Sequence, residues 1–146
     1  MEETMKDCVE DHTDATQMAL LQAFATLNAH TVVNEDGSIH VWYQGKTLEV
    51  FISNFLVRIW DMYWRTYSQN DPKPRIKDAV NFANYQPFAT VIFTETEDDF
   101  VYLHTKMDFM FTPNIPHQDE FLYIHLREFD LIRNRLDTYL DVKDLT

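Results

Sequence analysis

The segment SIHVWYQGKTLEVFISNFLVRIWDMYWRTY, residues 38–67, decides the fold of this chain and contains all three of its tryptophans. It is rich in β-branched and aromatic residues, which is typical of β-strands. A turn at residues 44–46 contains Gly45 and reverses the chain. In the following run Leu48, Val50 and Ile52 occupy alternate positions, so one side of that strand should face a core. The segment therefore predicts an antiparallel sheet at the centre of the protein.

The last part of this segment, residues 55–67, has two interpretations. As a helix it would carry a polar stripe at steps of three and four residues, formed by Asn54, Arg58, Asp61, Arg65 and Ser68. As a strand it would place alternate side chains on one face, namely Arg58, Trp60, Met62, Trp64 and Thr66. Its aromatic and β-branched content, together with the hairpin just before it, favours the strand. A strand here completes a meander of three strands.

The rest of the chain supplies elements that can cover this meander. Periodicity and capping signals predict helices over residues 14–28, 75–84 and about 118–140, and a hairpin of two strands over residues 88–107. In the last helix Arg127, Arg133 and Arg135 lie off the apolar stripe, so we expect them near solvent. The predicted fold is α+β: an N-terminal helix, an antiparallel three-strand meander, a short helix, a two-strand hairpin and a long C-terminal helix. Residues 1–12 are expected to form an acidic, flexible arm, and residues 13–146 a single domain.

The net charge of the chain limits the classes of partner that it can bind. Twelve lysines and arginines stand against 24 aspartates and glutamates, a formal net charge of -12. Such a surface repels phosphate backbones and anionic lipids, so we expect neither nucleic acid nor membrane as a partner. The sequence also lacks an apolar run near the ~18 residues of a membrane span. Cys8, the single cysteine, cannot form an intrachain disulfide, which fits a cytoplasmic protein.

Motifs that carry catalysis or ligand binding are missing from the sequence. The six histidines form neither HExxH nor any i, i+4 pair, and no CxxC occurs. Gly37 and Gly45 are the two glycines, so no glycine-rich phosphate loop can form. Cys8 lies among acidic residues, which disfavour a reactive thiolate. The acidic run at residues 95–99 lacks the spacing of a calcium loop and is interpreted as a solvated hairpin tip. We expect no enzymatic activity, no catalytic residues, no cofactor and no metal site.

The tryptophans are the remaining candidates for function. Trp42, Trp60 and Trp64, with Met62 between the last two, are the possible partner-binding residues. Large apolar side chains on the second face of the sheet need a cover, which helices of the chain, a second copy or another protein would supply. The sequence favours a non-enzymatic interaction module, chaperone-like or regulatory, that forms a homodimer and binds a protein client. The alternative is a small-molecule binder or undetected enzyme with a pocket lined by some of Trp42, Trp60, Tyr63 and Trp64, and polar groups such as Arg58, Arg65 or His104.

Three segments carry a resemblance to a known family. They are VWYQGKTLEVFISNFLVRIWDMYW at residues 41–64, IKDAVNFANY at residues 76–85, which includes Asn81 and Asn84, and ATVIFTETEDDFVYLHTKMDF at residues 89–109. In the order of its elements the chain resembles, over residues 18–140, the YbjN-like family of candidate bacterial sensory-transduction regulators, which have the fold of type III secretion chaperones. The resemblance implies a non-enzymatic α+β domain that dimerises and binds other proteins. It brings no catalytic residues, and the aromatic density at Trp60, Tyr63 and Trp64 departs from the family.

Overall fold

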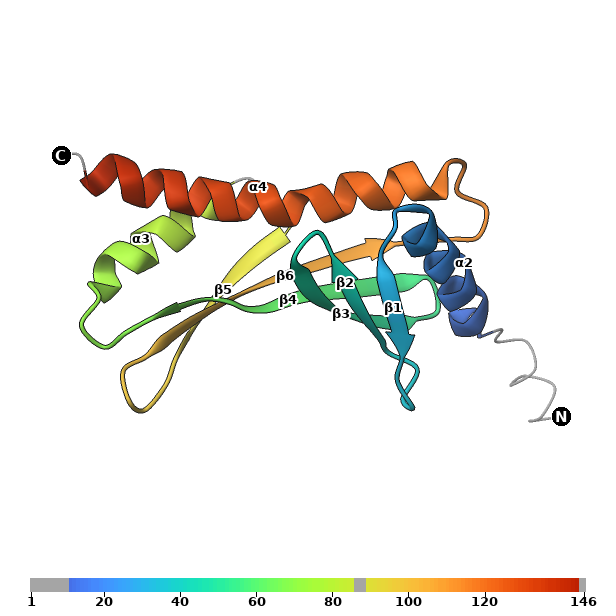
Figure 1. The fold of residues 1–146 in the computed structure, drawn as a ribbon, viewed down its shortest axis with the longest axis horizontal. Helices are drawn as coiled ribbons and strands as arrows, with labels where there is room; N and C mark the ends of the chain where they lie inside the picture. The colour runs from blue at the N-terminus through green and yellow to red at the C-terminus, as the bar shows by residue number, and fades with distance from the viewer. Residues whose placement is uncertain (1–10, 86–88, 145–146) are drawn as a thin grey trace, which may run out of the picture.

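A computed structural model describes residues 11–85 and 89–144 of the protein (Figure 1). In chain order its elements are α2 (Thr13–Thr26), β1 (His30–Val33), β2 (Ile39–Tyr43), β3 (Lys46–Ser53), β4 (Leu56–Tyr67), α3 (Lys73–Ala83), β5 (Ala89–Glu95), β6 (Val101–Met110) and α4 (Gln118–Asp144). The six strands form one antiparallel sheet in the order β1-β2-β3-β4-β6-β5. The predicted α+β fold is therefore confirmed.

The meander differs from the prediction in one strand. Within the segment 55–67, Leu56–Tyr67 form a strand as predicted, since β4 pairs with β3 on one side and with β6 on the other. The additional strand is β1, which pairs with β2 through four residues. The sequence predicts an extended segment at residues 31–33 and a turn at residues 34–37, but does not count this segment in the three-strand meander. A four-residue strand has little periodicity of its own, so the pairing with β2 defines it. The meander thus contains four strands, and β4 joins it to the β5–β6 hairpin.

The beginning of the chain becomes attached to the fold at Asp11 and His12. The backbone N–H of His12 donates a hydrogen bond to Asn54 Oδ1 at 3.0 Å, and its ring stacks on Phe55 with centroids 4.4 Å apart. Asp11 accepts from the backbone N–H and the hydroxyl of Thr13, which lowers the pKa of its carboxyl group. Asp11 and His12, which the sequence assigned to the flexible arm, therefore belong to the folded part, and residues 1–10, with Cys8, lie outside the described residues.

All three described helices lie on the same face of the sheet (Figure 1). The longest, α4, crosses the sheet and packs against α2 and α3. It contributes a buried stripe at three- and four-residue steps: Leu122, Leu126, Phe129, Ile132 and Leu136. The inward side chains of the strands complete the core, among them Val41, Leu48, Val50, Val57, Ile59, Leu103 and Met107. One face of the sheet is consequently sealed within the chain.

A row of ion pairs joins α4 to the strands beneath it. The three pairs are Lys46–Asp130, Asp61–Arg133 and Arg65–Asp137. Asp130, Arg133 and Asp137 follow one another at steps of three and four residues, so they point from one side of the helix. Arg133 contacts Asp61 Oδ2 through two nitrogens at 2.5 and 3.0 Å. The expectation that Arg133 faces solvent was wrong, because its guanidinium group reaches under the helix to this carboxylate.

Asp61 is the most buried member of that row, with only 2% of its surface exposed. Burial raises the pKa of Asp61 above its ordinary value, although hydrogen bonds and charge from Arg133 act in the opposite direction. The Trp64 ring lies beside this pair. Its Nε1–H donates to Thr105 Oγ1 at 2.9 Å, and the Arg133 guanidinium lies 5.1 Å from the ring centroid. The polar groups under α4 are therefore held together by charge, hydrogen bonds and an aromatic contact.

A β-bulge in β4 places Trp64 there. Asp61 pairs with Thr105 and Arg65 with Leu103, so residues 62–64 lie opposite the single residue His104. Tyr63 adopts a left-handed backbone with φ of 53°. Simple alternation places Trp64 with Trp60 and Met62, and this prediction was wrong because the bulge turns Trp64 toward α4.

The same bulge turns Tyr63 to the opposite face of the sheet. Its ring contacts the edges of Tyr102 and His104, with centroids 5.4 and 4.4 Å away. The backbone N–H of Tyr63 donates to His104 Nδ1 at 2.9 Å. Burial of His104 lowers the pKa of its imidazole. A neutral His104 that accepts through Nδ1 therefore holds the bulge in place.

We expect Asp61→Ala to lower the free energy of unfolding by about 3 kcal/mol, because it leaves Arg133 without its buried partner. Asp61→Leu combined with Arg133→Met should cost less, since both charges are removed together. Asp108→Ala is the matched control, because it breaks an Arg58–Asp108 pair whose side chains are 44% and 35% exposed. Urea denaturation of the three variants and the parent measures these differences. Equal losses for Asp61→Ala and Asp108→Ala would contradict the structural role of Asp61.

His104 predicts a dependence of stability on pH. Its pKa is lowered in the folded protein, so below about pH 6.5 the unfolded chain binds a proton that the folded chain does not. The free energy of unfolding should fall as the pH decreases from that value toward the folded pKa. His104→Asn retains an acceptor for the N–H of Tyr63 and removes the titration, so its stability should fall less steeply over this range. Chemical denaturation at several pH values compares the two proteins, which share the other histidines; identical slopes would refute the assignment.

Candidate functional site

The face of the sheet opposite the helices is the candidate functional site, and we call it the open face. Within the part of the chain that the structure describes, no helix covers it (Figure 1). Large apolar side chains on it are between 38% and 57% exposed: Trp42, Phe51, Leu56, Met62 and Met110. Trp60 is half-buried among them. Exposed apolar side chains gathered on one face are characteristic of interaction sites.

Strand register makes these side chains neighbours. Phe51 on β3 lies opposite Arg58 on β4, and Arg58 lies opposite Asp108 on β6. In the adjacent row Glu49, Trp60 and Lys106 follow one another across the same three strands. Directly opposite residues on one face of an antiparallel pair lie ~5 Å apart at Cβ, so apolar and charged groups alternate at contact distance.

The charges on the open face balance. Arg58 donates to both carboxylate oxygens of Asp108 at 2.8 and 3.0 Å. This pairing raises the pKa of Arg58 and lowers the pKa of Asp108. Lys106 lies over the Trp60 ring, 6.0 Å from its centroid, and Glu49 contacts Nδ1 of His40. Two cations and two anions thus leave this surface neutral, in a chain of formal net charge -12.

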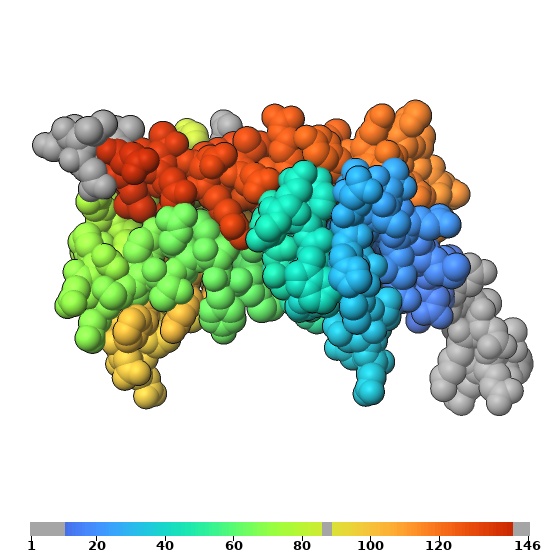
Figure 2. Space-filling view, in the orientation of Figure 1, coloured from blue at the N-terminus to red at the C-terminus, as the bar shows by residue number. Residues whose placement is uncertain are grey.

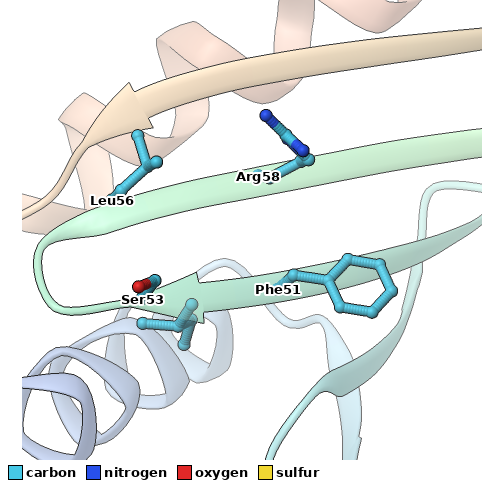
Figure 3. A pocket seen from close by; sticks show the side chains of 5 residues that line it. Phe51, Ser53, Leu56 and Arg58 are labelled. Carbon is cyan, nitrogen blue, oxygen red and sulfur yellow. The ribbon is translucent and has the colours of Figure 1, made fainter.

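A shallow hollow lies at one end of the open face, beside the β3–β4 turn. Figure 3 shows Phe51 and Ser53 on one strand and Leu56 and Arg58 on the next, and Ile52 completes its lining. The mixture of an aromatic ring, an aliphatic side chain and one guanidinium group suits a side chain of a partner better than a buried small ligand, because such ligands are enclosed over most of their surface.

Three of the four residues predicted to bind a partner lie on the open face. They are Trp42, Trp60 and Met62, whereas Trp64 lies on the helix-covered face and donates to Thr105. Of the four aromatic residues named in the alternative hypothesis, Trp64 is separated by the sheet from Trp42 and Trp60, so the four do not line one common pocket.

Phe51, Leu56 and Met110 also lie on the open face, although they are not among the residues predicted from the sequence. The outward position of Phe51 could be found from the alternation in β3, since it lies between Val50 and Ile52. Met110 could not, because it joins the site only through pairing with Leu56 across β4 and β6.

Metal ligands do not gather in the described part of the chain, where no group of three or more His, Cys, Asp or Glu side chains could hold an ion. Within residues 11–85 and 89–144, none of the helices combines the length and apolar character needed to cross a membrane.

Comparisons with known proteins find a solved structure with a similar fold. No family model matches the sequence, and no curated protein matches it. Among solved structures the chain is similar to YbjN from E. coli, described as a candidate transcription regulator. The TM-score is 0.58 at 10% sequence identity, and the match covers 86% of this chain and 92% of YbjN. At this identity the likeness concerns the fold. The protein therefore has a YbjN-like fold, as the order of its elements predicted.

Proposed function

We propose that this protein is a non-enzymatic interaction module whose open face binds a segment of another protein. The observation that supports the proposal is the row of exposed apolar side chains, which includes Trp42 and Met62, on a face that the described helices leave uncovered. Burying an aromatic side chain removes ~150 to 250 Å² from water, and each Å² contributes about 25 cal/mol. A partner on this surface would gain that energy.

The open face is large enough for a specific complex. Its six strands, spaced ~4.8 Å apart and about eight residues long at ~3.3 Å per residue, cover on the order of 600 Å² in projection. A standard protein interface buries ~800 Å² on each partner. Because side chains and the ends of the sheet add to the projected area, a single peptide segment or a small protein surface would fit this face.

The proposed role is regulatory or chaperone-like, and it operates through protein contacts. YbjN, which shares the fold, is described as a candidate transcription regulator. Direct contact with nucleic acid is disfavoured for this chain because its net charge of -12 repels phosphates. We place the protein in the cytoplasm, consistent with its single cysteine.

The predicted homodimer enters the proposal as self-association through the same face. The open face is neutral and carries Arg58 beside Asp108, so two copies can approach there with less repulsion than elsewhere on the acidic surface. We expect this pairing to be weaker than client binding and to compete with it. Light scattering at ~10 µM, a concentration that populates complexes of micromolar affinity, measures it.

Substituting exposed apolar residues should separate binding from folding. We expect Trp42→Gln with Met62→Gln to keep the stability of the parent, because each exposed site contributes within about 0.5 kcal/mol, while capture of client protein from host extract is lost. The control is Tyr123→Gln with Ile124→Gln, which removes two exposed apolar side chains from α4 and should leave capture intact.

The captured client, once purified, should slow hydrogen exchange in β3, β4 and β6. Protection confined to α4, or equal loss of capture in both variants, would refute the open face as the binding surface. Loss of dimer signal in the Trp42→Gln, Met62→Gln variant would show that self-association uses the same face.

A further inference from the structure

Two hairpin tips flank the open face. The β1–β2 tip comprises residues 34–37 and the β5–β6 tip residues 96–99, and both project away from α4 at opposite ends of the sheet (Figure 1). Figure 2 shows these tips extending beyond the strands between them. The hairpins belong to opposite edges of the strand order, four to five strand spacings apart. Across the sheet this amounts to about 20 Å at ~4.8 Å per spacing. The register also places the tips at opposite ends of the strands, because Ile39 beside the first tip is aligned with Met107, and residues 101–107 of β6 separate that level from the second tip. This adds about 20 Å along the strands at ~3.3 Å per residue, so the tips are about 30 Å apart.

Both tips are acidic. The β1–β2 tip exposes Glu35 and Asp36. The β5–β6 tip exposes Glu97, Asp98 and Asp99, of which Asp99 shares Lys73 with the neighbouring Glu95 at 3.1 and 2.6 Å. One lysine therefore offsets part of the charge at that end. The open face between the tips is neutral and apolar, so negative potential is concentrated at the two ends of the site.

From this arrangement we propose that the partner segment carries apolar side chains in its middle and lysine or arginine at both ends. The inference rests on the proposed function and adds the chemistry of the client. Its apolar centre would cover Trp42, Trp60 and Met62, and its terminal cations would meet the acidic tips. A span of about 30 Å corresponds to about nine extended residues or about 20 helical ones.

The placement of the cations matters more than their number. Exposed charges are screened beyond about 8 Å at physiological ionic strength. A lysine in the middle of the segment would meet two cations, Arg58 and Lys106, and two anions, Asp108 and Glu49, where the local charge is balanced. A lysine at either end would lie within reach of uncompensated acids. Two peptides of identical composition should therefore bind with different affinities.

Three synthetic peptides of about 20 residues with the same apolar residues test the proposal. The first carries two lysines at each end, the second carries the same lysines in its middle, and the third carries glutamates at the ends. Fluorescence anisotropy with the full chain at low and physiological salt gives the affinities. We expect the first peptide to bind ~10-fold tighter than the second, equivalent to about 1.4 kcal/mol, and the third to bind weakest.

Two variants with the same change in net charge localise the effect. Glu35→Gln, Glu97→Gln and Asp98→Asn together neutralise exposed acids of the tips. Asp78→Asn, Glu128→Gln and Asp141→Asn neutralise three acids on α3 and α4. The tip variant should remove most of the ~10-fold preference, and the helix variant should retain it.

The outcomes separate this inference from the proposed function. Equal affinity for the first two peptides, or equal effects of the two charge variants, would overturn the inference. The proposed function would still hold if Trp42→Gln with Met62→Gln abolished binding of both peptides. Peptide binding that this apolar variant leaves unchanged would place the peptide elsewhere and overturn the inference, as would failure of all three peptides to bind.

Discussion

The buried carboxylate of Asp61 constrains the whole arrangement. A carboxylate that is 2% exposed needs a charged, hydrogen-bonded partner, and Arg133 of α4 supplies two hydrogen bonds to it. This contact, with Lys46–Asp130 beside it, fixes α4 over β3 and β4. Since α2 and α3 pack against α4, all three helices occupy one side of the sheet. None of the described helices lies on the opposite side, so the position of the ion pair decides where the candidate site lies.

The fold was predictable where its signal was local. Leu48, Val50 and Ile52 alternate within eight residues, and β4 is too rich in β-branched and aromatic residues for its helical interpretation to prevail. The orientation of Trp64 was not predictable, because it depends on how β4 pairs with residues 40 positions later. A left-handed backbone at Tyr63 is also unusual for an aromatic residue, so no propensity indicates it. Arg133 was misplaced for a related reason: its partner becomes apparent only when Asp61 is known to face the helix.

In the candidate site, too, the features set by neighbouring residues were predictable and those set by strand pairing were not. Alternation along the first half of β4 placed Trp60 and Met62 on one face, as the structure does, because strand period depends on neighbouring residues alone. Trp42 lies on the same face. The contribution of Met110 depends on the β4–β6 register, and the length of β6 could not be fixed from the sequence. The boundary at which alternation fails is the bulge itself. After Met62, Tyr63 lies on the open face where alternation would have placed Trp64. The backbone N–H of Tyr63 donates a hydrogen bond to His104, and this bond stabilises the bulge.

The internal ion pairs also determine the charge that a partner meets. Lys46, Arg65 and Arg133 are used between the sheet and α4, and Arg58 is paired within the open face. Because the cations of these pairs cannot reach the hairpin tips, they do not offset the negative charge of the acidic residues there, at the periphery of the open face. The same pairs leave the centre of that face neutral, where desolvation costs least. Apolar contact at the centre and cation recognition at the ends are thus two consequences of how this acidic chain distributes its few basic residues.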